Sequence, residues 1–273
     1  MKVVIRNGVI VLDKYEGNDK NVIIPDGVVR IASCAFYECR NLESIEIPES
    51  VTNIGPMAFK GCSNLKNIKI PKGVTSIEEN TFERCYNLES IEIPDGVMSI
   101  GKRAFDECRS LKSIELPQSV MSIGYRAFSE CSDLESINIP NGVTSIREGT
   151  FFECRNLKNI EIPESVTWIA NNAFRECRSL EQVEISNGVE IIGESAFYRC
   201  SSLKNIEIPA SVTQIRTEAF YGCSNLESVN ISNGVMSIED GAFMACRKLK
   251  SIKIPASVTS IGERAFDGGC RLD

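Results

Sequence analysis

Residues 42–65 read LESIEIPESVTNIGPMAFKGCSNL, and variants of this stretch recur along the chain with a period of 23 residues. Leucine holds one position of every copy, at 42, 65, 88, 111, 134, 157, 180, 203, 226, 249 and 272. Phenylalanine holds another, at 36, 59, 82, 105, 128, 151, 174, 197, 220, 243 and 266. Such a period indicates one structural unit stacked about eleven times, each copy contacting its neighbours. The length of 273 residues therefore reflects the number of stacked coils and not the number of domains.

Within the quoted copy, the apolar spacing predicts the path of one coil. Residues 44–47 alternate polar and apolar side chains, which predicts a short half-buried strand. Pro48 ends that strand, and residues 49–50 form a turn. A second short strand is expected at 51–54, and residues 58–62 return apolar groups at the spacing of one helical turn. Strand, turn, short strand and helical turn together predict an α/β solenoid.

Stacked coils place equivalent strands about 4.8 Å apart, which predicts a parallel β-sheet, expected on the concave face. The ends of such an array need covers. Residues 1–19 contain a hairpin pattern around Asn7 and Gly8 and are expected to cap the first coil, leaving 20–273 as the solenoid of a single domain. Asp273 follows directly on the last repeat leucine. The apolar residues of the last coil are expected to be exposed, trimmed of a continuation or packed against another chain: Val258, Ile261 and Phe266.

The repeat at 42–65, which recurs almost whole at 111–134, resembles the BspA-like leucine-rich repeat family. The resemblance covers residues 20–273, and Tyr15-x-Gly17 followed by residues 22–25 is similar to the way such arrays begin. It implies a surface or secreted recognition and adhesion module of bacteria and some protists, without catalysis, with the concave sheet as the ligand face. The chain departs from the pattern at Ser186 and Ser232, which replace the strand-ending proline and affect local turns.

Composition excludes several classes of function. The 30 Lys and Arg residues against 37 Asp and Glu give a net charge of −7, without a basic run that could follow a nucleic acid backbone. Apolar stretches such as 9–12 are far too short to span a membrane. The chain has no histidine and no glycine-rich phosphate loop, which argues against an enzyme and against a bound cofactor.

Twelve cysteines could suggest disulfides or a metal site, but ten of them follow the repeat, at 39, 62, 85, 108, 131, 154, 177, 200, 223 and 246. Parallel side chains at the strand spacing of about 4.8 Å are too far apart and wrongly directed for disulfides. A Cys-x-x-Cys pair is also missing. We expect a core column of free thiols, with Cys34 and Cys270, which lie off the column, exposed.

Reduced cysteines and the absence of a signal-peptide pattern in residues 1–6 leave the compartment open. Either the protein is intracellular, or it begins after a removed leader. The family resemblance implies the cell surface or secretion.

Two outward columns of the first strand carry charge. The residue after each repeat leucine alternates between glutamate and lysine from Glu43 to Lys250, which predicts a weakly stabilising ladder of opposite charges. Further along the strand, Glu161, Glu184 and Glu207 would stand on neighbouring coils as like charges. This acidic strip predicts a docking site for a basic peptide. Its alternative is neutralisation of the strip by Lys158 and Lys204.

The residue after each repeat phenylalanine is a second candidate surface. Five consecutive copies place interface-type residues there, where earlier copies have mostly charged or small ones: Phe152, Arg175, Tyr198, Tyr221 and Met244. We call these five the ridge. Trp168 and Ile191 occupy one outward column of adjacent copies and are expected to support it. The alternative is scattered exposed apolar residues without function.

These observations favour a non-enzymatic protein-recognition or adhesion module that presents a repeat-built surface to a protein or peptide partner. The part of the partner that meets the acidic strip is expected to be basic. The alternative from another class is a structural scaffold that self-assembles through its exposed ends, including the C-terminal coil.

Overall fold

The computed structural model describes residues 1–268 and 271–272. Every regular element in this part of the chain is a β-strand, and the strands recur in pairs with the 23-residue period of the sequence. The structure is a parallel β-solenoid of about eleven coils, as the repeat predicts. The α/β class that we expected does not match it, because the described residues contain no helix. Accordingly, no helix in them is long and apolar enough to cross a membrane.

Tight turns stand where the sequence predicts a helical turn. In the copy at 42–65, Met57 has a φ of 57° and Gly61 a φ of 76°, on either side of Phe59. Left-handed residues four positions apart interrupt a right-handed helix. The backbone instead bonds to the next coil, since Phe59 N donates to Thr81 O at 3.0 Å. Spacing alone could not separate a helix from consecutive turns of this kind.

The contacts of the chain divide it into two compact units, Met1–Gly142 and Val143–Asp273. Each unit is described by itself. The division into a cap at 1–19 and a single solenoid domain remains a prediction.

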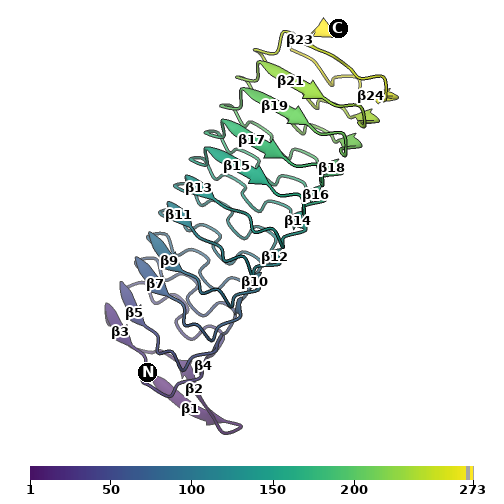
Figure 1. The fold of residues 1–273 in the computed structure, drawn as a ribbon. Helices are drawn as coiled ribbons and strands as arrows, with labels where there is room; N and C mark the ends of the chain where they lie inside the picture. The colour runs from purple at the N-terminus through teal and green to yellow at the C-terminus, as the bar shows by residue number, and fades with distance from the viewer. Residues whose placement is uncertain (269–270, 273) are drawn as a thin grey trace. The chain divides into compact units, whose positions relative to one another are not determined.

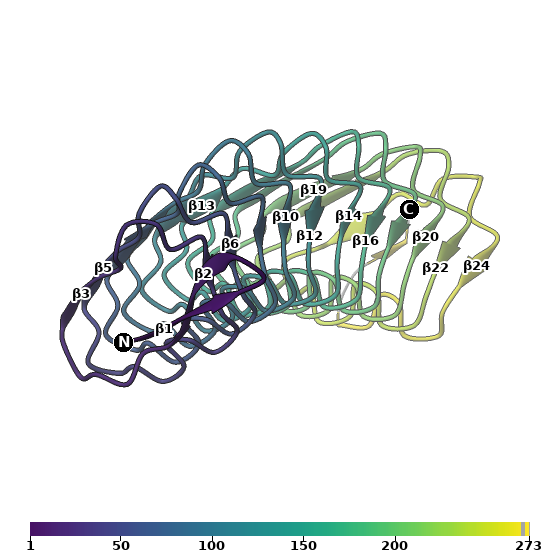
Figure 2. The same cartoon turned by 90° about the horizontal axis from the view of Figure 1, so that it is seen from below.

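The first unit begins with an antiparallel hairpin of β1 (Lys2–Arg6) and β2 (Val9–Lys14). Asn7 and Gly8 form its turn with φ values of 51° and 76°. β2 then pairs in parallel with β4 (Arg30–Ile31), which pairs with β6 (Asn53–Ile54). The order β1-β2-β4-β6 places the hairpin beside the first coil of the array (Figure 2).

The remaining strands of the first unit form parallel sheets on two sides of the coils (Figure 1). One sheet contains β3 (Asn21–Ile23), β5 (Ser44–Glu46), β7 (Asn67–Lys69) and β9 (Ser90–Glu92). Next to it, β11 pairs with β13, at Ser113–Ile114 and Ser136–Ile137. The other sheet contains β8 (Ser76–Ile77), β10 (Ser99–Ile100) and β12 (Ser122–Ile123).

The second unit repeats this arrangement. On one side, β15 (Asn159–Ile162) pairs with β17 (Gln182–Ile185), β19 (Asn205–Ile208) with β21 (Ser228–Ile231), and β23 (Ser251–Ile252) with β25 (Arg271–Leu272). On the other side runs a six-stranded parallel sheet of β14 (Ser145–Ile146), β16 (Trp168–Ile169), β18 (Ile191–Ile192), β20 (Gln214–Ile215), β22 (Ser237–Ile238) and β24 (Ser260–Ile261). Except in the β23–β25 pair, where they are 20 apart, paired residues of this unit are 23 positions apart, so equivalent side chains of successive coils form columns.

A column of phenylalanine rings fills the core of each unit. Phe197 is fully buried, and its ring lies 5.1 Å from those of Phe174 and Phe220, nearly parallel to both. Leu203, Val189 and Ala196 of the same coil are buried around it. Deleting a buried phenylalanine typically costs about 3–5 kcal/mol, so each ring is a large part of the stability of its coil.

The described cysteines are all free thiols, and nine of the ten column cysteines are buried. Cys39 is half-buried and Cys34 is exposed. Cys270 lies outside the described residues. Eight of the buried thiols donate to a backbone carbonyl of the preceding coil, as where Cys200 Sγ donates to Phe174 O at 3.2 Å. Burial raises the pKa of the Cys200 thiol well above its usual value, which keeps the thiol protonated and unreactive.

We therefore predict that, in a Cys270→Ser background, Cys34 alone reacts quickly with a thiol reagent in the native protein. Cys39 should follow slowly, because burial raises its pKa. The nine buried thiols should react only after denaturation. The measurement is the time course of labelling with and without guanidinium, and Cys34→Ser is expected to remove the fast phase. Fast native labelling of several thiols would contradict a closed core.

Candidate functional site

The ridge lies on the tight turns of the second unit. Each ridge residue follows a core phenylalanine and therefore points away from the core. All five ridge side chains are half-buried. The Arg175 guanidinium carbon lies 4.0 Å from the centre of the Tyr198 ring, and the Tyr198 ring stacks on Tyr221 at 4.8 Å and 7°. Backbone hydrogen bonds place Phe152 and Met244 on the flanking coils, since Glu153 N donates to Arg175 O and Gly222 N to Met244 O, both at 2.8 Å.

This contact holds three long side chains in place before any partner arrives. A cation over an aromatic ring contributes about 0.5–1 kcal/mol at exposed sites, and an aromatic pair adds about 0.5–1.5 kcal/mol. Arg199 approaches Tyr198 from another side, with its guanidinium carbon 5.3 Å from the ring centre. The ridge is therefore an ordered strip.

Trp168 and Ile191 form a patch on the six-stranded sheet. They are paired neighbours on β16 and β18, and Trp168 is 43 % exposed. Among the described residues, no hydrogen bond or ring contact joins Trp168 to the ridge. The structure thus gives no direct support for its expected role beside the ridge, and we treat Trp168 and Ile191 as a separate surface.

The acidic strip lies on the other sheet of the same unit. Glu161 and Glu184 are directly paired on β15 and β17, and Glu207 stands on β19, the next strand. All three are exposed, and within residues 1–268 and 271–272 none forms an ion pair. The proposed neutralisation by Lys204 is not seen, because Lys204 Nζ lies 3.1 Å from Glu181 Oε2.

That lysine pair belongs to the alternating ladder, which the structure forms at several places. In the first unit, Lys20 Nζ lies 2.7 Å from Glu43 Oε1, and this hydrogen bond lowers the pKa of the Glu43 carboxyl. The ladder residues are exposed, except for the half-buried Glu43, so their role is surface complementarity with little effect on stability.

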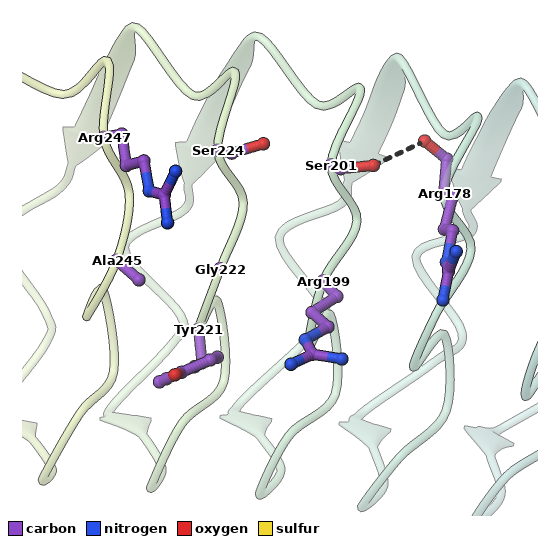
Figure 3. A pocket seen from close by; sticks show the side chains of 8 residues that line it. All are labelled: Arg178, Arg199, Ser201, Tyr221, Gly222, Ser224, Ala245 and Arg247. Carbon is purple, nitrogen blue, oxygen red and sulfur yellow. Dashed lines mark hydrogen bonds between the residues drawn. The ribbon is translucent and has the colours of Figure 1, made fainter.

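Sequence reasoning missed an open pocket of about 430 Å³ beside the ridge. Tyr221 contributes one wall, and the rest comes from the segments around the column cysteines of neighbouring coils (Figure 3). These residues are Arg178, Arg199, Ser201, Gly222, Ser224, Ala245 and Arg247. The signal that could have found it is the residue before each column cysteine, which changes from Glu176 to Arg199, Gly222 and Ala245.

Comparison with known proteins identifies the fold family. The BspA type leucine-rich repeat region matches the chain in six copies, over residues 14–131, 75–183 and 167–273. The chain belongs to this family. The match confirms the resemblance seen in the repeat at 42–65. Leucine-rich repeat proteins typically mediate protein interactions or adhesion and are generally not enzymes.

Solved structures of bacterial leucine-rich repeat proteins are similar to the chain. One from Bacteroides ovatus is 28 % identical, with a TM-score of 0.69, and the match covers 98 % of this chain and 90 % of that one. One from T. pallidum is 29 % identical, with a TM-score of 0.54 and coverage of 74 % and 87 %. The pneumococcal vaccine antigen PcpA, at 18 % identity, a TM-score of 0.58 and coverage of 93 % and 79 %, shares the fold. No curated protein matches the chain.

The pairing of Glu161 with Glu184 predicts a small gain in stability when one charge is removed. Glu184→Gln should raise the free energy of unfolding by about 0.2–0.5 kcal/mol at low salt, because like charges directly opposite repel. Chemical denaturation at about 10 mM and 1 M NaCl tests this, and the gain should vanish at high salt.

The matched control is Glu181→Gln, which removes a carboxylate paired with Lys204 in the same strand region. It should leave stability unchanged or lower it slightly. Equal gains for both variants would show that general charge reduction, and not the acidic strip, is responsible.

Proposed function

We propose that the chain is a non-enzymatic protein-recognition module and that its partner binds at the ridge. The observation that carries this proposal is the continuous contact of Arg175, Tyr198 and Tyr221, in a column that is polar at 60, 83, 106 and 129. Phe152 and Met244 extend the column by one coil on each side.

The residue types support a protein partner. Tyrosine and arginine are enriched among the residues that contribute most to binding in protein interfaces. They bury a large surface and keep a polar group for hydrogen bonding. Because the stack already orders Tyr198 and Tyr221, binding loses less side-chain entropy than it would with free side chains. The ridge can therefore give useful affinity from a small area.

The two other surfaces of the second unit are proposed as auxiliary contacts. The acidic strip would attract a basic segment of the partner, because Glu161, Glu184 and Glu207 have no cation of their own among the described residues. Such an attraction accelerates association and weakens with salt. Trp168 and Ile191 would add apolar contact on the opposite sheet, for a partner that reaches around the coils.

The ridge predicts a large loss of binding when both tyrosines are truncated. Peptides selected by display on the intact chain serve as ligands. Replacing Tyr198 and Tyr221 together by Ala should cost more than about 2 kcal/mol of binding, roughly thirty-fold in Kd, because the central anchors are lost. Stability should fall by no more than about 1–2.5 kcal/mol, the sum of the lost ring pair and cation–ring contact, since neither ring occupies the core.

Tyr37→Ala is the matched control, because Tyr37 occupies the same column in the first unit and is 46 % exposed. It should leave the affinity unchanged. If the double variant binds the selected peptides as tightly as the parent chain, the ridge is not the site.

Self-association is the alternative function that we propose, with the last coil as its contact surface. Ile261 is 43 % exposed, whereas the equivalent Ile238 is fully buried, and Val258 and Phe266 are half-buried. Exposed apolar core residues favour contact with a second surface. A concentration-dependent dimer or larger species in sedimentation velocity, lost in Ile261→Lys, would support this alternative. A monomer across the concentration range would exclude it.

A further inference from the structure

The turn segments of this chain follow a charge rule. In four coils, an arginine directly follows the column cysteine, and a glutamate two residues before that arginine accepts its hydrogen bond. In the first unit, Arg109 Nη2 lies 2.7 Å from Glu107 Oε2, and in the second, Arg178 Nε lies 2.8 Å from Glu176 Oε2. The other two pairs are Arg40 with Glu38 and Arg155 with Glu153.

Arg247 is the exception to this rule. It stands in the same position of its coil, but Ala245 replaces the glutamate. Within residues 1–268 and 271–272, the Arg247 guanidinium forms no ion pair and no hydrogen bond. A carboxylate that the repeat supplies elsewhere is therefore missing at one coil.

The neighbouring coils do not replace that carboxylate. Arg199 reaches Glu176 Oε1 at 3.4 Å, but Glu176 already accepts the shorter bond from Arg178. Arg178 and Arg199 therefore share one carboxylate and Arg247 has none among the described residues, which leaves a local excess of positive charge on a chain of net charge −7. Arg178 and Arg247 are separated by two coils, in which Ser201 and Ser224 occupy the arginine position.

The same substitutions hollow out the surface. Gly222 and Ala245 remove the side chains that fill this position in other coils, and the space becomes part of the pocket of about 430 Å³. In Figure 3, the Arg247 guanidinium extends toward the segment of Gly222 and Ser224, and the Arg199 guanidinium extends toward Tyr221. Two cations from coils on either side of Gly222 thus border one cavity.

We propose that this pocket binds a carboxylate side chain of an acidic partner segment, which replaces from outside the glutamate that the coil of Arg247 lacks. Arg247 and Arg199 hold the carboxylate, and the Ser224 hydroxyl is available as a further donor. The inference rests on the proposed function, because the pocket adjoins the ridge at Tyr221 and gives the partner of the ridge a chemical character.

The arginine–glutamate pairs of other coils favour a carboxylate over other anions at this position. The equivalent arginines bind glutamate oxygens at 2.7 and 2.8 Å from a backbone of nearly constant shape. Ala245 has a φ of 61°, and Glu107 and Glu176 have φ values of 61° and 62°. The position is therefore already suited to an arginine–carboxylate pair, and a partner has only to supply the acid.

The closing experiment restores the missing glutamate. Ala245→Glu places a carboxylate two residues before Arg247, in a backbone conformation that glutamate adopts in other coils. Ala245→Gln has nearly the same size without the charge and is the matched control. The probe is a short glycine- and serine-flanked peptide with two glutamates, titrated at low salt into the ¹⁵N-labelled full chain and followed by NMR.

The glutamate peptide should shift the amide signals of Gly222, Ser224 and Ala245 or its replacement in a saturable way, and the same peptide with glutamines should not. Binding should weaken at least ten-fold in Ala245→Glu and stay within three-fold in Ala245→Gln. Equal binding by the two variants, no shifts with the glutamate peptide, or saturable shifts with inorganic phosphate alone would overturn the proposal.

The test is separate from that of the ridge. If the pocket fails while the tyrosine double variant loses its selected peptides, the ridge stands as the site and the carboxylate assignment is wrong. If the glutamate peptide binds as expected while the tyrosine variant keeps full affinity, the pocket is a carboxylate site independent of the ridge.

Discussion

Stacking of each coil on the next is the interaction on which the structure depends. The core rings of Phe174, Phe197 and Phe220 contact one another at 5.1 Å, and the backbone turns beside them bond from coil to coil. A single coil has almost no interior of its own, so its apolar residues are buried only by its neighbours. The same contact fixes the 23-residue register, which places equivalent sequence positions of neighbouring coils beside one another in columns. Core and surface columns alike follow from this one constraint.

Much of the fold could be predicted because the repeat is nearly exact in its core positions. The columns of leucine, phenylalanine and cysteine are buried in the structure as the period indicates, with Cys39 and the residues of the last coil as partial exceptions. The turn at 49–50 was predicted, but the tight turns on either side of each core phenylalanine were not. Met57, Arg84 and Glu107 adopt the left-handed backbone conformation, which their residue types do not predict. Their conformation is set by bonds to the next coil, which a single copy of the repeat does not show.

The surface was predicted less evenly. Contiguity of the ridge followed from the period, because consecutive copies must place Arg175, Tyr198 and Tyr221 side by side. The arginine pocket was missed, because its signal is the absence of a side chain at Gly222 and Ala245 and of a partner for Arg247. A prominent side chain such as Tyr198 is easily noticed in a sequence, whereas a small residue in place of a glutamate is not. The meaning of a small residue appears only when the ion pair formed at that position in other coils is known.

The ring separation of 4.8 Å between Tyr198 and Tyr221 limits what can lie lengthwise along the ridge. An extended strand presents side chains of one face about 6.6–6.8 Å apart and loses phase with such a column within a few coils. An α-helix repeats every 5.4 Å along its axis and so drifts from the column by only about 0.6 Å per turn. The spacing of the column therefore matches the repeat of a helical ligand lying parallel to it better than the repeat of an extended ligand.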